Sequence, residues 1–102
     1  METFENEVVQ IALLAGNDGV IRDTAFEGCH VKGPAVIAPR NTDFAHNTLD
    51  APDTDALLWE VPPERKRIVG AILVEDCAFR GCTFSMVGIT GPKALVDQFR
   101  DS

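Results

Sequence analysis

Residues 76–82 read Asp-Cys-Ala-Phe-Arg-Gly-Cys, and residues 23–29 read Asp-Thr-Ala-Phe-Glu-Gly-Cys. Five of the seven positions are identical. A repeated segment predicts a repeated structural unit, so this stretch decides the expected fold. Both copies belong to a five-residue rhythm with a large apolar residue in the third place and a small or apolar residue in the first. In the second copy the third places are Val74, Phe79, Phe84 and Ile89, and the first places are Ile72, Cys77, Cys82 and Val87.

The first copy follows the same rhythm, and two further pentads, 42–46 and 47–51, separate the copies. Apolar residues two positions apart lie on one side of an extended segment. A turn-tolerant residue then bends the chain before the next pentad. The pattern therefore predicts stacked short strands, with Phe over Phe and Cys over Cys. In the first copy the third places are Ile21, Phe26, Val31 and Val36, and the first places are Gly19, Thr24, Cys29 and Pro34.

This rhythm resembles that of the pentapeptide-repeat proteins, whose pentads carry a central Leu or Phe with a small residue two places earlier. The resemblance covers about half of the chain. It implies a mainly β fold, a short right-handed β-solenoid of about three coils. The chain also resembles a group of small bacterial proteins, a likeness that implies no activity. The stretches shared with that group are Gly33–Val36, then Leu58, Trp59 and Pro62, and finally Val87–Gly91.

An ordinary small antiparallel sheet is the alternative fold, because alternating Phe and Val also suit that kind of strand pairing. A chain of 102 residues is long enough for one domain and too short for two hydrophobic cores. We expect a single domain over residues 1–102, in which 17–51 and 68–91 form the repeat coils.

Both ends of the chain have the apolar spacing of amphipathic helices. We expect one helix over residues 1–16 and another over residues 92–102, where Pro92 suits a first helical position. The two helices are expected to cap the two ends of the apolar column. The apolar residues are Phe4, Val8, Ile11 and Ala15 in the first helix, and Leu95, Val96 and Phe99 in the second.

The rhythm is absent from residues 52–67, which we interpret as a β-hairpin insertion. Residues 56–61 read as a strand, 62–64 as a turn and 67–74 as a return strand. The insertion carries the only Trp and the only cluster of basic residues. Binding residues concentrate on loops that a rigid scaffold holds in place. The candidate partner-binding residues are therefore Trp59, Arg65, Lys66 and Arg67. In the alternative interpretation Trp59 covers apolar surface of the middle coil and the basic cluster is solvated.

Few residues suit catalysis, and we expect neither a cofactor nor enzymatic activity. His30 and His46 are the only bases that titrate near neutral pH. His30 follows Cys29 directly, but neighbours in a strand point to opposite faces and do not readily form a nucleophile–base pair. The odd number of cysteines fits apolar packing better than a disulfide framework or a zinc site.

Acidic residues around His46 could bind a divalent cation, but they lack the spacing and the Gly of a calcium loop. A solvated acidic surface is therefore the expectation. The acidic residues concerned are Asp43, Asp50, Asp53 and Asp55.

The chain carries 9 Lys and Arg and 16 Asp and Glu, for a net charge of -7. This charge, with one Trp and no Tyr, argues against binding of nucleic acid through its phosphates. No apolar run is long enough to span a membrane, and the first residues carry acids where a signal peptide carries bases. We therefore expect a cytoplasmic protein that does not bind membranes.

The leading hypothesis is a non-catalytic protein-interaction or scaffold module whose protein partner is unknown. Exposed strand edges favour self-association, most simply as a homodimer. The resemblance supplies one alternative, an acidic DNA-mimicking inhibitor of a DNA-binding enzyme, because some pentapeptide-repeat proteins are acidic rods. This chain is shorter than those rods, and its acids do not form two long rows. A small hydrolase or isomerase with His30 or His46 as its base is the other alternative.

Overall fold

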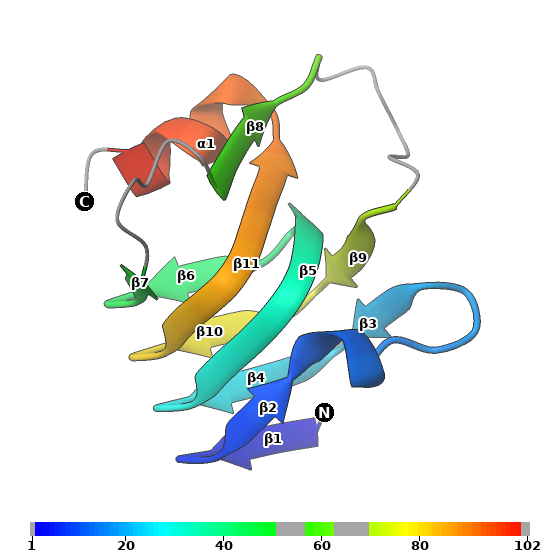
Figure 1. Ribbon diagram of the computed structural model, residues 1–102, viewed down its shortest axis with the longest axis vertical. Coiled ribbons are helices and arrows are strands. Elements are labelled where there is room, and N and C mark those ends of the chain that lie inside the picture. Colours follow the sequence, from blue (N-terminus) through cyan, green and yellow to red (C-terminus); the bar gives the residue numbers. More distant parts are fainter. Residues whose placement is uncertain (1, 51–56, 63–69, 101–102) are drawn as a thin grey trace.

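The computed structural model describes residues 2–50, 57–62 and 70–100, and these residues form a compact, mainly β structure with one α-helix (Figure 1). In chain order the elements are β1 (Glu2–Glu5), β2 (Val8–Gln10), a 3-10 helix (Ile11–Leu13), β3 (Val20–Arg22), β4 (Thr24–Glu27), β5 (His30–Arg40), β6 (Asp43–Ala45), β7 (Thr48–Asp50), β8 (Leu58–Glu60), β9 (Ile72–Glu75), β10 (Ala78–Arg80), β11 (Thr83–Gly91) and α1 (Lys93–Arg100).

All strand pairs among these residues are parallel. One sheet has the order β1–β4–β10–β6. The other has the order β3–β9–β5–β11–β7, with β2 beside β5 and β8 beside β11. Parallel pairing throughout contradicts the antiparallel alternative and is compatible with the predicted solenoid.

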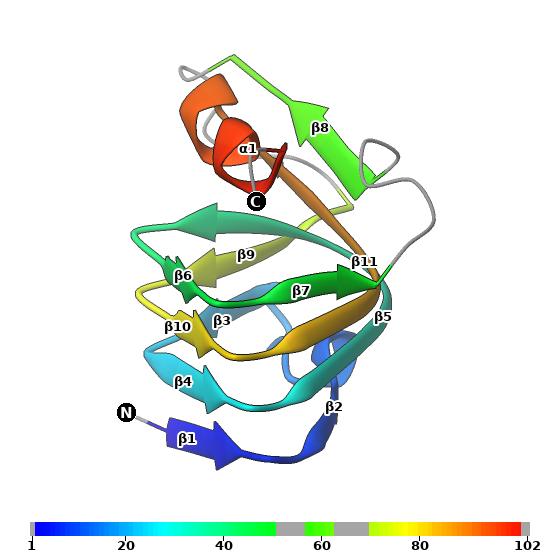
Figure 2. The same ribbon diagram turned by 90° about the vertical axis from the view of Figure 1, so that its left-hand side faces the viewer.

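The strands stack in levels, which we call rungs, and each rung runs across both sheets (Figure 2). Rung 1 is β1 and β2, and rung 2 is β3, β4 and the start of β5. Rung 3 is β9, β10 and the start of β11, and rung 4 is the end of β5 with β6 and β7. Rung 3 thus lies between rungs 2 and 4, although the chain forms rung 4 before it reaches rung 3. The spatial order of the rungs differs from their order in the sequence.

The repeat seen in the sequence stacks on itself, because rung 3 lies on rung 2 with each residue against its own copy. Phe26 pairs with Phe79, and Phe79 pairs in turn with Phe44 of rung 4. The rings of Phe4, Phe26, Phe79 and Phe44 form one stacked column. Successive ring centroids lie 5.5, 4.6 and 5.3 Å apart, with interplanar angles of 13° or less. The expected column of phenylalanines is confirmed.

Left-handed residues turn the chain at two corners of rungs 2, 3 and 4 and at one corner of rung 1. Such residues are mostly Gly, Asn and Asp, which adopt positive φ at little cost. Their backbone N–H groups also bond to the next rung, as Gly28 N does to Arg80 O at 2.8 Å. The turns predicted after the pentads are therefore confirmed at Asp23, Gly28, Asp76 and Gly81, whereas Gly33 and Gly91 lie within β5 and β11. One corner holds Asn6, Gly28, Gly81 and His46, and the other holds Asp23, Asp76 and Asn41.

A bulge in β5 adds one residue to the five-residue rhythm, so the inward residue after Val31 is Ile37 rather than Val36. Lys32 pairs with Ser85 and Ala35 with Val87, so two residues of β5 face one residue of β11. Beyond the bulge Ile37 is fully buried, whereas Val36, which the rhythm placed inside, is only half-buried. The prediction for Val36 was wrong because the pentad rhythm does not register the additional residue.

The helix predicted over residues 1–16 is also wrong. Residues 2–13 form two strands and a 3-10 turn. Phe4 stacks on Phe26, and Val9 is 6% exposed while Val8 is 66% exposed. Phe4 and Val9 lie five positions apart, so this segment follows the pentad rhythm. Pairing with rung 2 overrides a weak helical pattern.

The hairpin insertion is contradicted within the described residues, because β8 pairs in parallel with the end of β11 and β9 pairs in parallel with β3 and β5. The turn residues 63 and 64 lie outside the described part.

The C-terminal helix, expected over 92–102, is confirmed as α1. Val96 and Phe99 of this helix are buried. The Phe99 ring meets Phe44 edge-on at a centroid distance of 4.9 Å. This contact closes one end of the phenylalanine column, as expected for a cap.

Candidate interaction groove

A shallow apolar groove of about 560 Å³ lies where the bulged parts of β5 and β11 meet β8, and we call it the Trp59 groove. Trp59 is 49% exposed and Met86 is 67% exposed, which makes them two of the four exposed large hydrophobic side chains in the described residues. None of the lining side chains is ionisable. The groove is lined by the side chains of Pro34, Ala35, Val36, Leu57, Trp59 and Met86.

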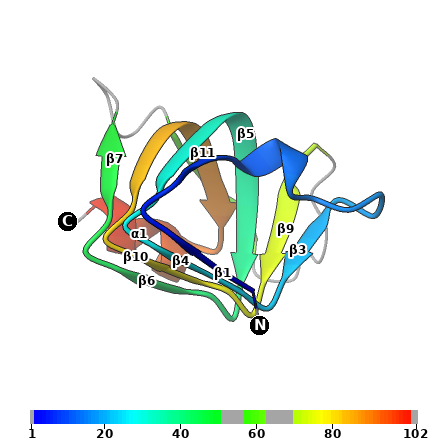
Figure 3. The same ribbon diagram turned by 90° about the horizontal axis from the view of Figure 1, so that it is seen from below.

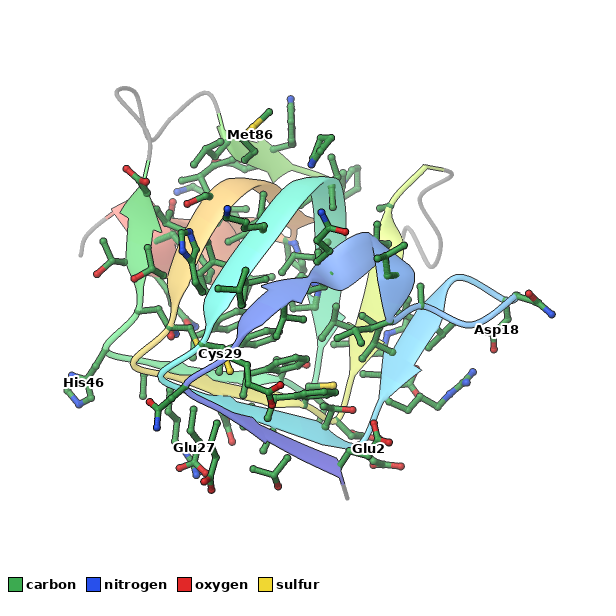
Figure 4. The ribbon with its side chains drawn as sticks, turned by 60° about the horizontal axis from the view of Figure 1, so that its bottom comes forward. Glu2, Asp18, Glu27, Cys29, His46 and Met86 are labelled. Atoms are coloured by element: carbon green, nitrogen blue, oxygen red, sulfur yellow. The ribbon has the colours of Figure 1, made fainter. Side chains whose placement is uncertain are left out.

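The bulge builds one wall of the groove. Gly33 packs directly on the backbone of Met86, and a Cβ on Gly33 would overlap the Met86 carbonyl oxygen. The peptide between Gly33 and Pro34 is cis, and Met86 has a φ of 57°. Because Met86 takes up this left-handed conformation between the buried Phe84 and Val87, its own side chain lies on the outer surface (Figure 4).

Trp59 forms the opposite wall and lies against a glycine. β8 pairs with the end of β11, which sets Trp59 beside Thr90. A Cβ on Gly88 would overlap Cζ3 of the indole ring and lie 3.2 Å from Cη2. Glycine at position 88 therefore allows the indole to approach the sheet closely and still expose about half of its surface.

Of the predicted partner-binding residues, the structure places Trp59 in this groove. Arg65, Lys66 and Arg67 lie outside the described residues. The structure brings Trp59 together with Pro34 and Met86, which sequence reasoning did not select as binding residues. Pro34 lies in the shared stretch 33–36, which linear order separates from Trp59, and Met86 lies in none of the shared stretches.

Three polar side chains, one from each of rungs 2, 3 and 4, contact one another on the outer face of β5, β11 and β7. His30 Nε2 lies 2.7 Å from Ser85 Oγ. Ser85 Oγ in turn donates to Asp50 Oδ2 at 3.3 Å. The serine stands in the middle of this chain, whereas hydrolytic triads place histidine between serine and the carboxylate. A hydroxyl turned toward His30 would form a nucleophile–base pair. Sequence reasoning identified no partner for His30, because Ser85 lies 55 positions away in the chain.

His46 lies at a corner of rung 4. Its φ is 58°, and its side chain is exposed and points away from the strands (Figure 4). Asp43 is exposed on β6, and Asp50 on β7 binds Ser85. Within the described residues there is no group of three or more His, Cys, Asp or Glu placed to hold a metal ion. Asp53 and Asp55 of the predicted acidic cluster lie outside them.

The three cysteines are free and buried, as apolar packing requires. Their thiols donate to backbone carbonyls of the preceding rung: Cys29 to Phe4, Cys77 to Ile21 and Cys82 to Phe26. Burial raises the pKa of the Cys77 and Cys82 thiols. A raised pKa lowers the thiolate population and with it the nucleophilic reactivity of both residues.

Comparison of the chain with models of protein families, with curated proteins and with solved structures found no match. The pentapeptide-repeat resemblance therefore rests on the residues alone. In the described part of the chain, no helix has both the length and the apolar character needed to span a membrane.

Proposed function

We propose that this protein is a non-catalytic protein-interaction module built on a short right-handed β-solenoid of the pentapeptide-repeat kind. The parallel rungs, the stacked phenylalanines and the left-handed corners support the solenoid. The three free cysteines fit a reducing compartment and support a cytoplasmic location.

The Trp59 groove is the observation that carries the functional proposal. An exposed Trp and an exposed Met side by side are unusual on a soluble surface, and both residue types are enriched where proteins contact one another. The lining has hydrophobic walls and no ionisable group, so its occupant is an apolar segment of a partner protein. The rigid parallel stack holds the walls in place before binding, which lowers the entropy cost of association.

The test is affinity capture from lysate of the source organism with four baits. These are the unchanged protein, Trp59→Ala, Met86→Ser and the matched control Leu13→Ser, which removes an equally exposed apolar side chain outside the groove. A protein captured by the unchanged chain and by the control, and lost with both groove variants, supports the proposal. Identical captures with all four baits would remove the groove from the function. Sedimentation of the same variants shows whether the occupant is a second copy of the chain.

The contact between His30 and Ser85 favours one second candidate, a small hydrolase. Ser85 would act as nucleophile and His30 as its base. Turnover of p-nitrophenyl acetate by the unchanged protein, lost in both Ser85→Ala and His30→Gln, would support it. Equal rates for all three proteins would exclude it.

A further inference from the structure

The two ends of the stack differ in what covers the last ring of the phenylalanine column. At the rung 4 end, Phe99 of α1 covers the ring of Phe44. At the rung 1 end, the Phe4 ring stacks on Phe26 from one side, and no described aromatic ring lies on its other side. β1 and β2 are the outermost strands at that end, where Figure 3 shows them nearest the viewer. The described residues thus leave one end of the phenylalanine column open.

The outer backbone edge of rung 1 is open as well. Glu2 N donates to Asp23 O and Asn6 N donates to Glu27 O, so these amides face rung 2. In a parallel ladder alternate residues face opposite neighbours, so the amides of Thr3 and Glu5 face outward. On β2 the carbonyl of Glu7 accepts from His30 N, which turns the amide of Val8 outward by the same alternation. Among the described residues no strand pairs with this edge. Such an edge is a template for one more strand.

The charge of rung 1 defines the chemistry of that strand. Residues 2–13 contain three glutamates, Glu2, Glu5 and Glu7, and no basic residue. All three are exposed (Glu2 is labelled in Figure 4). A second copy of this chain paired edge to edge would bring glutamates against glutamates, which disfavours self-pairing. A basic strand would instead be attracted.

We propose that the open edge of rung 1 binds an extended, basic segment of another protein by strand addition. Backbone groups of the segment pair with Thr3, Glu5 and Val8. A large apolar side chain of the segment lies on the free face of Phe4 and continues the column. Lys or Arg side chains of the segment lie beside Glu5 and Glu7. This surface is separate from the Trp59 groove and does not depend on it.

The probe is a charge-reversed copy of the rung itself, the peptide Lys-Thr-Phe-Lys-Asn-Lys-Val-Val-Gln, with the native sequence of residues 2–10 as the control peptide. Titration into isotope-labelled protein is followed by amide chemical shifts. We expect the amides of β1 and β2 to shift with the basic peptide and to stay unchanged with the native one. Raising the salt from about 0.05 M to about 0.5 M should weaken binding several-fold, because the charges are exposed.

Two protein variants make the test specific. Thr3→Pro removes one outward amide and leaves the pairing with rung 2 intact, since proline is tolerated where the N–H faces away from the sheet. It should lower the affinity for the basic peptide about ten-fold relative to the matched Thr3→Ala variant. The Glu5→Gln, Glu7→Gln double variant keeps the fold and should weaken binding about five-fold while reducing its salt dependence.

Several results would overturn the proposal. One is the absence of shifts in β1 and β2 with the basic peptide, and another is equal affinity for Thr3→Pro and Thr3→Ala. A dimer of the unchanged protein that Thr3→Pro dissolves would assign the edge to a second copy instead. Trp59→Ala distinguishes the two surfaces, because it should leave the affinity for the peptide unchanged whether or not the Trp59 groove binds a partner.

Discussion

The position of rung 3 between rungs 2 and 4 can be tested by double-mutant cycles on the phenylalanine column. The substitutions are Phe26→Leu, Phe79→Leu and Phe44→Leu, singly and in pairs. Leucine retains most of the buried apolar surface and removes the aromatic ring. Each single variant should lose about 1–2 kcal/mol of unfolding free energy. A domain with about 5–15 kcal/mol of stability therefore still folds when two rings are replaced.

The geometry sets the expected coupling energies. The rings of Phe26 and Phe79 are fully buried, 4.6 Å apart and within 3° of parallel. Such a pair contributes about 1 kcal/mol beyond the area it buries. Phe26 and Phe44 lie on opposite faces of Phe79, about 10 Å apart, where substitutions add within about 0.3–0.5 kcal/mol. Coupling should thus be large for Phe26 with Phe79 and negligible for Phe26 with Phe44.

Urea unfolding followed by circular dichroism gives the free energies of all seven proteins, with similar m-values as the check that the unfolded states are comparable. A stack that followed the order of the sequence would place Phe44 next to Phe26. A coupling between Phe26 and Phe44 larger than that between Phe26 and Phe79 would therefore refute the interleaved order of rungs.

Three further outcomes follow from single contacts. Gly33→Ala should cost about 2–3 kcal/mol in urea unfolding, because its Cβ overlaps the backbone across the bulge. The contribution of Cys77 and Cys82 to stability should be constant below about pH 9 and fall above it, because both thiols have raised pKa values in the folded state and ionise more readily once unfolded. Gly88→Ala should displace the indole of Trp59, the only Trp, and change its fluorescence emission.

Each of these outcomes has its own check. Gly81→Ala, at a corner where a Cβ meets no other atom, should cost only about 1 kcal/mol, and an equal cost at Gly33 would contradict the close approach. A Cys77→Val, Cys82→Val variant should have a flatter stability profile at alkaline pH. An unchanged profile would remove the thiols as its cause. An emission spectrum unaltered by Gly88→Ala would contradict the contact with Trp59.

The sequence predicted the local features of the fold well, because they depend on residue type. Most of the large residues in third places, Phe79 and Phe84 among them, are buried. The corners carry residues that tolerate positive φ, such as Asp23 and Asp76. The C-terminal helix was predicted from its apolar face and Pro92.

The arrangement of the rungs was beyond prediction, because periodicity states which side chains point inward and not which strands become neighbours. Trp59 was selected as a binding residue because it is the only Trp and lies in the segment interpreted as an insertion. Its companion Met86 reaches the same groove because β11 lies between β5 and β8, an arrangement that periodicity does not state. The contact between His30 and Ser85 requires two residues 55 positions apart to meet on adjacent strands. The register that brings His30 close to Ser85 follows from the two repeat copies only if these copies are stacked directly on one another.

The interleaving of the rungs also governs the order in which the protein can be completed during its synthesis. Residues 2–50 are synthesised before residues 72–91, so β6 and β7 are made before the strands they pair with. In a stack built in sequence order, each coil can settle on its predecessor as soon as it is made. Here rung 3, which lies between rungs 2 and 4, is synthesised last, and its partners on rung 2 lie 53 positions earlier in the chain. Contacts over such separations form slowly. A chain that ends before residue 72 would therefore leave residues 42–50 with no strand to pair with.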